Sequence, residues 1–372
     1  MVNILQLITS IDLGGAENVA FNIVEYSQKQ YPGKFNFVIA ELFSQKKQFS
    51  LQKKEELMTK NIPYISLYHG QKRISLLVAP FRLMTYIKKH NLDIIHSHTD
   101  LPDFVLATTL RLLSLFRIRK PRIVRTIHNT QLWAEHRFIG KYTEKIYIND
   151  CIVAVSEASM TAYNNLRKKY SLPTSIYQHT VLNGCPVPSK KEHELRIDRK
   201  RINIAFCGRF EYQKGIDVLI DIIREVDQKW GNTFLFHVIG QGTYKNKLIE
   251  LLKCTDCLIL YDAIPGMSEK FHAFDFLIMP SRFEGLVLTS IEASLSKVPV
   301  IASFAVGLEE TLPKDWPLKF HLECTNEILT IFENIVNQKY DLVSLKEEVF
   351  AFAYKMFSVE TMVKKYSMIY QT

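Results

Sequence analysis

Short apolar runs alternate with amphipathic stretches along nearly the whole chain. The apolar runs have the length and continuity of strands that are buried on both faces of a parallel sheet. The stretches between them carry apolar residues at helical spacing, so one face of each helix would cover that sheet. In the first half the pattern predicts strands at residues 4–9, 37–42, 62–67, 92–98, 123–127 and 151–155, and helices near 18–29, 53–60, 76–90, 104–116 and 141–149.

The second half of the chain repeats this alternation. It predicts strands at residues 202–207, 234–239, 258–261, 276–279 and 300–302, and helices at 216–230, 286–296 and 345–370. Between the halves, the Pro-rich and charged segment 186–192 is typical of a linker. We therefore expect an α/β protein with one domain over residues 1–188, a second over 189–354 and a helical end over 355–372.

Composition agrees with a two-domain globular protein. The chain has 372 residues, of which 47% are hydrophobic and 23% are charged. No uncharged apolar stretch reaches the length of about 18 residues that a membrane helix needs. The apolar segment 2–8 lacks a basic leader and a cleavage site, so we expect a first strand and a cytoplasmic protein. The formal net charge of +9 indicates an anionic partner without naming one.

Among the six cysteines, Cys254 and Cys257 have the C-x-x-C spacing of a metal site. A zinc site would also need a second cysteine pair or histidines at ligand spacing, and none follows nearby. Cys257 opens an apolar run. We therefore expect buried, reduced thiols here and no metal.

The clearest candidate for chemistry is the stretch 276–299, an apolar strand followed by a turn and a helix. Gly285 in the turn has no Cβ, so a ligand can approach its backbone closely. The helix N-terminus offers unpaired N–H groups and a partial positive charge, which suit a phosphate. Glu284 lies in the turn and Glu292 about two helical turns further on. These carboxylates could hold a sugar and a ribose, although the spacing alone also fits two solvated side chains.

Other loops at predicted strand ends carry candidate phosphate ligands. Arg209 and Lys214 are five residues apart after the strand 202–207, where two cations can clamp a pyrophosphate. The alternative is two solvated surface charges. Gly240 and Gly242 form a G-x-G after the next strand, a weak sign of a nucleotide-facing loop, and Ile264 follows the strand after that.

The first half places three histidines at strand ends. His96, His98 and His128 would all lie at the carboxyl edge of the sheet, where ligands of such folds bind. A single histidine there is usually structural, and these three stand within the patterns D-I-I-H-S-H and T-I-H. Nothing in their spacing sets the geometry of a zinc site. The turn at Gly14 and Gly15, before the first helix, is equally explained as a simple turn or as a phosphate loop.

The segment P-S-R-F-E-G-L-V-L-T-S-I-E-A-S at residues 280–294 resembles the signature of the retaining glycosyltransferases of family 4, the glycosyltransferases group 1. G-R-F-E-Y-Q-K-G at 208–215 and D-I-I-H-S-H at 93–98 resemble further motifs of this family, in the same order. The resemblance covers nearly the whole chain. It implies the GT-B fold, in which two Rossmann-like domains face a central cleft and the last helix packs back on the first domain.

The resemblance also implies roles for the residues that match these motifs. Glu284 would contact the donor sugar, Glu292 would bind the ribose hydroxyls, and the loop at Gly15 would approach the donor phosphates. The expected donor-binding residues are Gly15, Arg209, Lys214, Gly240, Gly242, Ile264, Glu284, Gly285, Leu286, Val287 and Glu292. The expected acceptor-side residues are His96, His98 and His128, and the expected catalytic residues are Glu284, His128, Arg209 and Lys214.

The implied activity is that of a retaining hexosyltransferase. It would move a sugar from a nucleotide diphosphate sugar, by default a UDP-sugar, to a hydroxyl of a glycan or lipid-linked acceptor in bacterial surface polysaccharide or glycolipid synthesis. No Asp-x-Asp occurs in the chain, so Arg209 and Lys214 would supply the positive charge that a metal supplies elsewhere. We expect no metal, no cofactor and no nucleic-acid partner. The alternatives are a GT-B sugar-nucleotide 2-epimerase and a catalytically silent sugar-nucleotide-binding partner.

A basic segment in the first half suggests where the protein acts. Residues 104–134 contain no acidic residue, and apolar side chains are interleaved with basic ones. Anionic lipid headgroups attract such a segment, so we expect peripheral attachment to the inner face of the cell membrane. The alternative is a solvated helix end with its leucines in the core. The residues are Arg111, Arg117, Arg119, Lys120, Arg122 and Arg125, with Leu112, Leu113, Leu115, Phe116 and Ile118.

Overall fold

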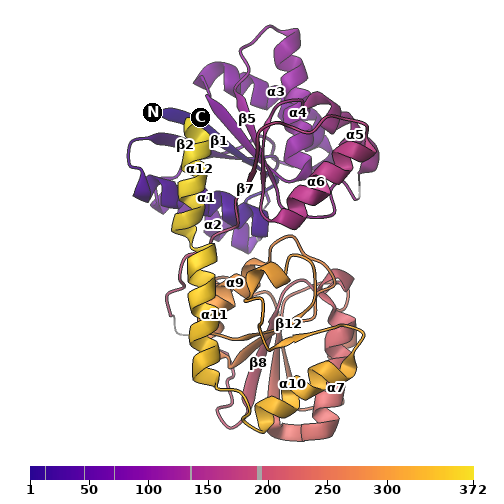
Figure 1. The fold of residues 1–372 in the computed structure, drawn as a ribbon. Helices are drawn as coiled ribbons and strands as arrows, with labels where there is room; N and C mark the ends of the chain where they lie inside the picture. Colours follow the sequence, from indigo (N-terminus) through magenta and orange to yellow (C-terminus); the bar gives the residue numbers. More distant parts are fainter. Residues whose placement is uncertain (13, 46, 71, 135, 191–194) are drawn as a thin grey trace. The chain divides into compact units, whose positions relative to one another are not determined.

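The computed structural model describes residues 1–12, 14–45, 47–70, 72–134, 136–190 and 195–372. The chain divides into two compact units, Met1–Gly184 with Val359–Thr372 and Cys185–Ser358 (Figure 1). The backbone N–H of Cys185 donates to Phe357 O at 2.9 Å, and Cys185 also pairs with Ser358 in a short bridge. The two places where the chain passes from one unit to the other, at Cys185 and at Ser358, are therefore both tied to the second unit. This unit begins four residues before and ends four residues after the boundaries expected from the sequence.

The first unit is built on a seven-stranded parallel sheet with the order β3-β2-β1-β4-β5-β6-β7. Its strand order reverses between β1 and β4, which are paired from Ile4 with Ile94 onward. Such a reversal places the loops after those two strands at the ligand-binding edge of the sheet. The strands are β1 (Val2–Ile8), β2 (Phe35–Glu41), β3 (Tyr64–Ser66), β4 (Ile94–His98), β5 (Arg122–Ile127), β6 (Cys151–Ala154) and β7 (Gln178–Thr180).

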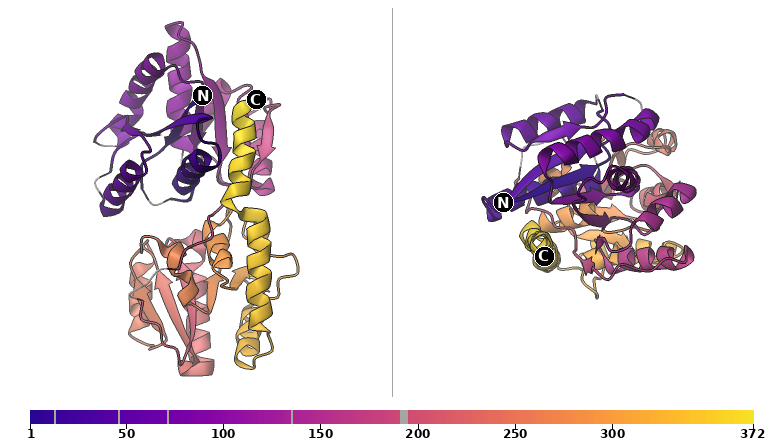
Figure 2. Two further views of the ribbon diagram at one scale, coloured as in Figure 1. Left: turned by 90° about the vertical axis from the view of Figure 1, so that its left-hand side faces the viewer. Right: turned by 90° about the horizontal axis from the view of Figure 1, so that it is seen from above.

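Helices cover both faces of this sheet (Figures 1 and 2). α3 packs on α4 and α4 on α5, whereas the last helix of the chain, α12 (Val359–Gln371), packs on α1. The predicted helical stretch 345–370 is thus two helices, because the backbone is extended at Ser358 and α12 belongs to the first unit. The other helices are α1 (Gly15–Gln30), α2 (Gln48–Thr59), α3 (Lys72–His90), α4 (Asp100–Leu115), α5 (Arg137–Ile146) and α6 (Glu157–Lys169).

The second unit contains a six-stranded parallel sheet with the order β10-β9-β8-β11-β12-β13. Its order reverses between β8 and β11. The strands are β8 (Ile202–Cys207), β9 (Phe234–Ile239), β10 (Leu258–Tyr261), β11 (Phe276–Met279), β12 (Val300–Ser303) and β13 (Lys319–Phe320). The helices are α7 (Ile216–Trp230), α8 (Lys245–Leu252), α9 (Leu288–Leu295), α10 (Thr325–Val336) and α11 (Leu342–Phe357), with short 3-10 turns at Tyr212–Lys214, Gly231–Thr233, Met267–Ala273 and Glu309–Thr311.

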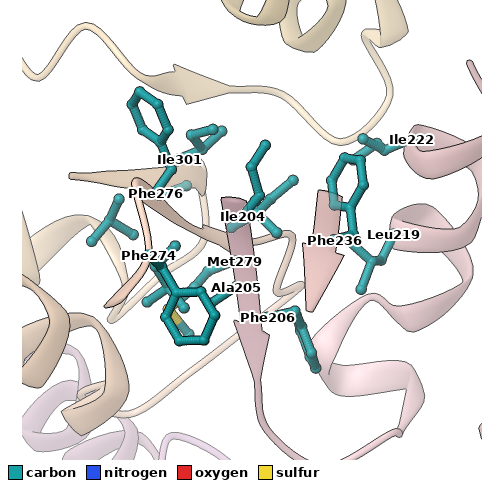
Figure 3. Packing of buried hydrophobic residues seen from close by; sticks show 14 of the residues in the cluster. Ile204, Ala205, Phe206, Leu219, Ile222, Phe236, Phe274, Phe276, Met279 and Ile301 are labelled. Carbon is teal, nitrogen blue, oxygen red and sulfur yellow. The ribbon is translucent and has the colours of Figure 1, made fainter. Parts of the chain in front are cut away.

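The core of the second unit follows from the apolar runs in the sequence. β9, β11 and β12 are buried along their whole length, as expected for strands with helices on both sides. Phe206, Phe236 and Leu219, from β8, β9 and α7, are among the side chains that fill the space around the sheet (Figure 3). This packing holds the strand ends, and hence the loops that follow them, in place.

The buried charges of the first unit correct one expectation. Arg125 on β5 is only 1% exposed, and its guanidinium binds the carboxylates of Asp103, Glu144 and Asp150. The sequence suggested that Arg125 belongs to an exposed basic surface, and its burial shows that it does not. The reason is that β5 lies inside the sheet, where both of its faces are covered.

The cysteines and the linker differ in part from the expectation. Every cysteine is a free thiol; Cys257 is buried as expected, but Cys254 is exposed. Residues 186–190 of the predicted linker belong to the second unit, and residues 191 and 192 lie outside the described part of the chain. Among the described helices, none is both long and apolar enough to cross a bilayer.

Candidate active site

The candidate donor site lies at the carboxyl edge of the second sheet, where the loops after β8, β11 and β12 meet. Gly215 has a positive φ of 65°, and a Cβ there would lie 1.8 Å from the carbonyl oxygen of Pro280. Gly307, with φ of 81°, would meet the carbonyl oxygen of Gly285 at 2.2 Å in the same way. The three loops therefore pack backbone against backbone, and only glycine is compatible with these two contacts.

The G-x-G after β9 supports the neighbouring loop. Gly240 and Gly242 both have positive φ, and a Cβ would lie 1.9 Å from Gly208 O or 2.5 Å from Phe210 O, respectively. The glycines thus allow the loop that carries Arg209 to pack closely on them. This packing explains both glycines without a ligand, so their contact with a nucleotide stays a prediction.

A buried ion pair joins two of the loops. Lys214 Nζ lies 2.6 Å from Glu284 Oε1, and the two side chains are 14% and 8% exposed. Removing two opposite charges from water is costly, and their mutual attraction compensates only when the geometry is good. The structure therefore brings together the expected phosphate-binding cation and the expected sugar-binding carboxylate.

Gln213 extends this pair to Arg209 and was not predicted from the sequence. Its side-chain oxygen accepts from Arg209 Nη2 at 3.2 Å, and its Nε2 donates to Phe283 O at 3.1 Å and to Glu284 Oε2 at 3.4 Å. One amide therefore orients a cation and a carboxylate at once. The only signal in the sequence was its position beside Lys214 within the G-R-x-x-x-x-K-G motif.

Arg282, which was also not predicted from the sequence, stabilises the turn before Glu284. Its guanidinium donates to both carboxylate oxygens of Asp217, at 2.8 and 2.7 Å, and lies 3.8 Å from the centre of the Tyr212 ring. Its backbone N–H donates to Gln213 O at 2.9 Å. These contacts connect the turn after β11 to the loop and helix that follow β8.

Glu292 lies on α9, which begins at Leu288, two residues later than expected. Burial raises the pKa of the Glu292 carboxyl to about 7. The described residues provide it with no hydrogen bond or ion pair, so its oxygens are available to ligand hydroxyls. Leu286 and Val287, just before the helix, are buried, and Ile264 is half-buried against the core.

The three histidines of the first unit are placed differently from one another. His96 and His98 are fully buried, and both ring nitrogens of each are hydrogen-bonded within the unit. Neither ring therefore has a nitrogen free for an acceptor, and the contact with an acceptor that the sequence suggested for these two residues stays a prediction. His128 is half-buried; its Nε2 lies 3.0 Å from His98 Nδ1, and its Nδ1 has no partner among the described residues.

The glycine turn before α1 is shaped by Glu17. A Cβ at Gly14 would lie 2.0 Å from Glu17 Oε2, so the carboxyl folds over this glycine. Burial raises the pKa of Glu17 to about 7. Gly15 is the first residue of α1, and its approach to a phosphate stays a prediction. Residue 13 of this turn lies outside the described residues.

Comparison with known proteins supports the interpretation of both units. Residues 13–176 match the family "Glycosyltransferase Family 4", and residues 201–321 match "Glycosyl transferases group 1". A 41.2 kDa protein in the cps region of Klebsiella pneumoniae is 27% identical over 315 residues, which cover 81% of this chain and 85% of that protein. The O-antigen biosynthesis glycosyltransferase WclY of Escherichia coli is 24% identical over 298 residues, covering 76% and 81%.

The fold is also shared with solved structures, among them a glycosyltransferase from Rickettsia africae with a TM-score of 0.74 at 18% identity, covering 100% of this chain and 98% of that chain. The crystal structure of Anabaena HepE in complex with UDP superposes with a TM-score of 0.78 at 16% identity, and the match covers 100% of both chains. The predicted arrangement of two Rossmann-like domains is confirmed by this likeness and by the two parallel sheets.

The raised pKa of Glu292 predicts the effect of Glu292→Gln on stability. Wild type loses stability as the pH rises from about 4.5 towards 7, because the ionised carboxyl is disfavoured in the folded state. The neutral amide escapes this loss. We expect Glu292→Gln to be more stable than wild type at pH 8 by up to about 3 kcal/mol and equally stable at pH 4.5, in thermal or urea unfolding.

The exposed carboxylate of Glu323 in the same unit provides a control. Glu323→Gln should change stability little at either pH. A Glu292→Gln variant that gains no stability between pH 4.5 and pH 8 would contradict the burial of this carboxyl.

Proposed function

Because the chain belongs to the group 1, family 4 glycosyltransferases of the GT-B fold, we propose that it is a retaining hexosyltransferase that uses a UDP-sugar. The acceptor would be a hydroxyl of a glycan or lipid-linked sugar in bacterial surface polysaccharide or glycolipid synthesis. The UDP complex of Anabaena HepE and the O-antigen role of WclY support the donor and the pathway class. The single observation that carries the proposal is the Lys214–Glu284 pair at the switch point of the second sheet.

The proposed donor site meets the charge of the diphosphate with protein cations. Lys214 is held as a point charge between the loops, and exposed Arg209 can form paired N–H bonds to a phosphate. The leaving group gains negative charge as the bond to the sugar breaks, so preorganised cations stabilise the transition state more than the bound substrate. Glu292, whose carboxyl oxygens have no partner among the described residues, would accept hydrogen bonds from the ribose hydroxyls.

Glu284 would orient the donor sugar. Its Oε1 is occupied by Lys214, while among the described residues Oε2 has only the longer contact of 3.4 Å to Gln213. This second oxygen can therefore accept a sugar hydroxyl while the first keeps the lysine in place. A carboxylate near the sugar would also favour the partial positive charge of an oxocarbenium-like transition state. For retention, the leaving phosphate would help to deprotonate the acceptor on the same face of the sugar.

The transfer reaction tests this proposal directly. We expect purified protein to transfer a hexose from one of a set of UDP-, GDP- and ADP-sugars to acceptors in a bacterial lipid or polysaccharide extract, with UDP preferred. Activity should persist in EDTA, because Arg209 and Lys214 supply the positive charge. NMR of the product should show the anomeric configuration of the donor.

Several results would contradict the proposal. Loss of transfer in EDTA with recovery in magnesium or manganese would show that a metal performs the role given to the two cations. An inverted product would exclude retention. Conversion of the donor to its 2-epimer, or donor binding without any transfer, would favour the epimerase or the silent binding partner instead.

We also propose peripheral attachment to an anionic membrane through the end of α4. Leu115 and Phe116 are 74% and 58% exposed, and Arg117, Arg119 and Lys120 beside them are exposed as well. Leu113, in contrast, lies in the core. The exposed apolar side chains could enter the lipid interface while the cations attract headgroups.

The neighbouring helix carries a second exposed apolar stripe. α3 packs on α4 and contains no acidic residue. Three of its apolar residues are spaced so that they lie on one face of the helix, and all three side chains are exposed: Ile74 at 42%, Leu77 at 73% and Phe81 at 54%. An apolar stripe of this kind on a basic helix is typical of helices that lie at a membrane surface.

Liposome co-sedimentation tests the attachment. The protein should bind vesicles that contain anionic lipid, and the bound fraction should fall as the salt concentration rises. Replacing Arg117, Arg119 and Lys120 by Glu should abolish binding. The same charge change at exposed Lys145, Lys168 and Lys169 of the first unit should reduce it far less. Equal binding to neutral and anionic vesicles, or none to either, would favour a soluble acceptor.

A further inference from the structure

A chain of hydrogen bonds connects His128 with the last helix of the protein. His128 Nε2 lies 3.0 Å from His98 Nδ1, and His98 Nε2 lies 2.7 Å from Gln6 Oε1. The amide nitrogen of Gln6 donates to the hydroxyl of Tyr370 at 3.0 Å. Residues from β1, β4, the loop after β5 and α12 thus form one continuous path, which we call the relay.

The relay continues on the far side of Tyr370. The Tyr370 hydroxyl lies 2.6 Å from His96 Nδ1, and His96 Nε2 lies 2.6 Å from the hydroxyl of Thr126. Within the described part of the chain, the hydroxyl of Tyr366, one turn earlier on α12, bonds only to Thr126, at 3.0 Å. It therefore lies beyond the relay, and none of the bonds between His128 and His96 depends on it.

The histidines of the relay are neutral. Burial lowers the pKa of His128 to about 3 and holds the pKa values of His96 and His98 well below their usual range. The rings of His96 and His98 lie 4.1 Å apart, where two charges would repel each other. No carboxylate of the described residues hydrogen-bonds to any of the three rings. Each ring therefore carries one N–H and one bare nitrogen.

The orientation of the Gln6 amide decides which nitrogen carries the proton. Its oxygen faces His98, so His98 must donate through Nε2. The neutral ring then has a bare Nδ1, which can only accept, and His128 must donate to it through Nε2. His128 is left with a bare Nδ1 that has no partner among the described residues.

We propose that Gln6 and Tyr370 are positioning residues that hold His128 as the Nε2-protonated tautomer, so that its Nδ1 accepts a hydrogen bond from a substrate sugar hydroxyl. The proposal rests on the proposed function in naming the sugar as the ligand. Tyr370 acts by donating its hydroxyl proton to His96 Nδ1, so that its oxygen is left to accept the N–H of Gln6 and the amide keeps this orientation. Its ring is held in the core by edge contacts with Phe35 and Phe37, at 5.9 and 6.1 Å between centroids.

The tautomer can be measured without substrate, so the result is independent of whether the enzyme transfers sugar. In long-range ¹H–¹⁵N NMR of the histidine-labelled full chain, assigned with His128→Gln, His128 should show a protonated Nε2 and a bare Nδ1 between pH 6 and pH 8. A protonated Nδ1, or a ring that titrates in this range, would overturn the proposal.

Two matched variants test the role of Tyr370. Tyr370→Phe and Tyr366→Phe each remove one buried hydroxyl from α12. Tyr370→Phe should give a mixture of His128 tautomers, because the Gln6 amide loses its acceptor, and should lower kcat/KM about threefold to tenfold. Tyr366→Phe should keep the wild-type tautomer and kcat/KM within about twofold.

The outcomes separate positioning from a merely structural role. If both variants lose stability and activity equally while the His128 signals stay those of wild type, α12 is only a structural support and the proposal fails. If Tyr370→Phe does not fold, Gln6→Leu in the same NMR measurement replaces it, since this change removes the acceptor of His98 directly. An unchanged His128 tautomer in Gln6→Leu would likewise overturn the proposal.

Discussion

The candidate site depends on the ion pair between Lys214 and Glu284, which are 2.6 Å apart and almost excluded from water. A buried pair of this kind contributes little net stability, and breaking it leaves an uncompensated charge. The surrounding structure maintains it by close backbone packing at Gly215 and Gly307 and by the Gln213 amide. Folding alone does not require the charged pair around which these loops are arranged. Such a pair is therefore what we expect in a binding site for a charged ligand.

In the first unit, the side chains at the strand reversal of the sheet are uncharged. Around its own strand reversal, His96, His98 and Gln6 are buried and hydrogen-bonded, and in the proposed tautomer His128 keeps one bare nitrogen that has no partner among the described residues. A bare imidazole nitrogen can accept from a sugar hydroxyl without attracting or repelling a diphosphate. In the proposed assignment, the second unit carries the charges that suit the nucleotide, and the first unit carries polar, uncharged groups.

Much of the fold could be predicted from the sequence, because buried parallel strands are continuous apolar runs; β8, β9, β10 and β11 have the bounds expected from them. The positions of Glu284, Arg209 and Lys214 could also be predicted, since they follow such strands directly. Side-chain partners could not. Gln213 was marked only by its place in the motif, and the burial of Arg125 by no local signal, because the bridging role of the one and the burial of the other depend on residues far away in the sequence.

The most direct test is the affinity for UDP and for a UDP-sugar, measured by calorimetry on wild type, Lys214→Met and Glu284→Gln, with Lys229→Met as a control at an exposed lysine of the same unit. Loss of a charged hydrogen bond to phosphate predicts that Lys214→Met weakens UDP binding about tenfold to a hundredfold. Glu284→Gln should weaken the UDP-sugar much more than UDP, and Lys229→Met should change neither. If Lys214→Met binds UDP as tightly as wild type does, the site assigned to the second unit is wrong.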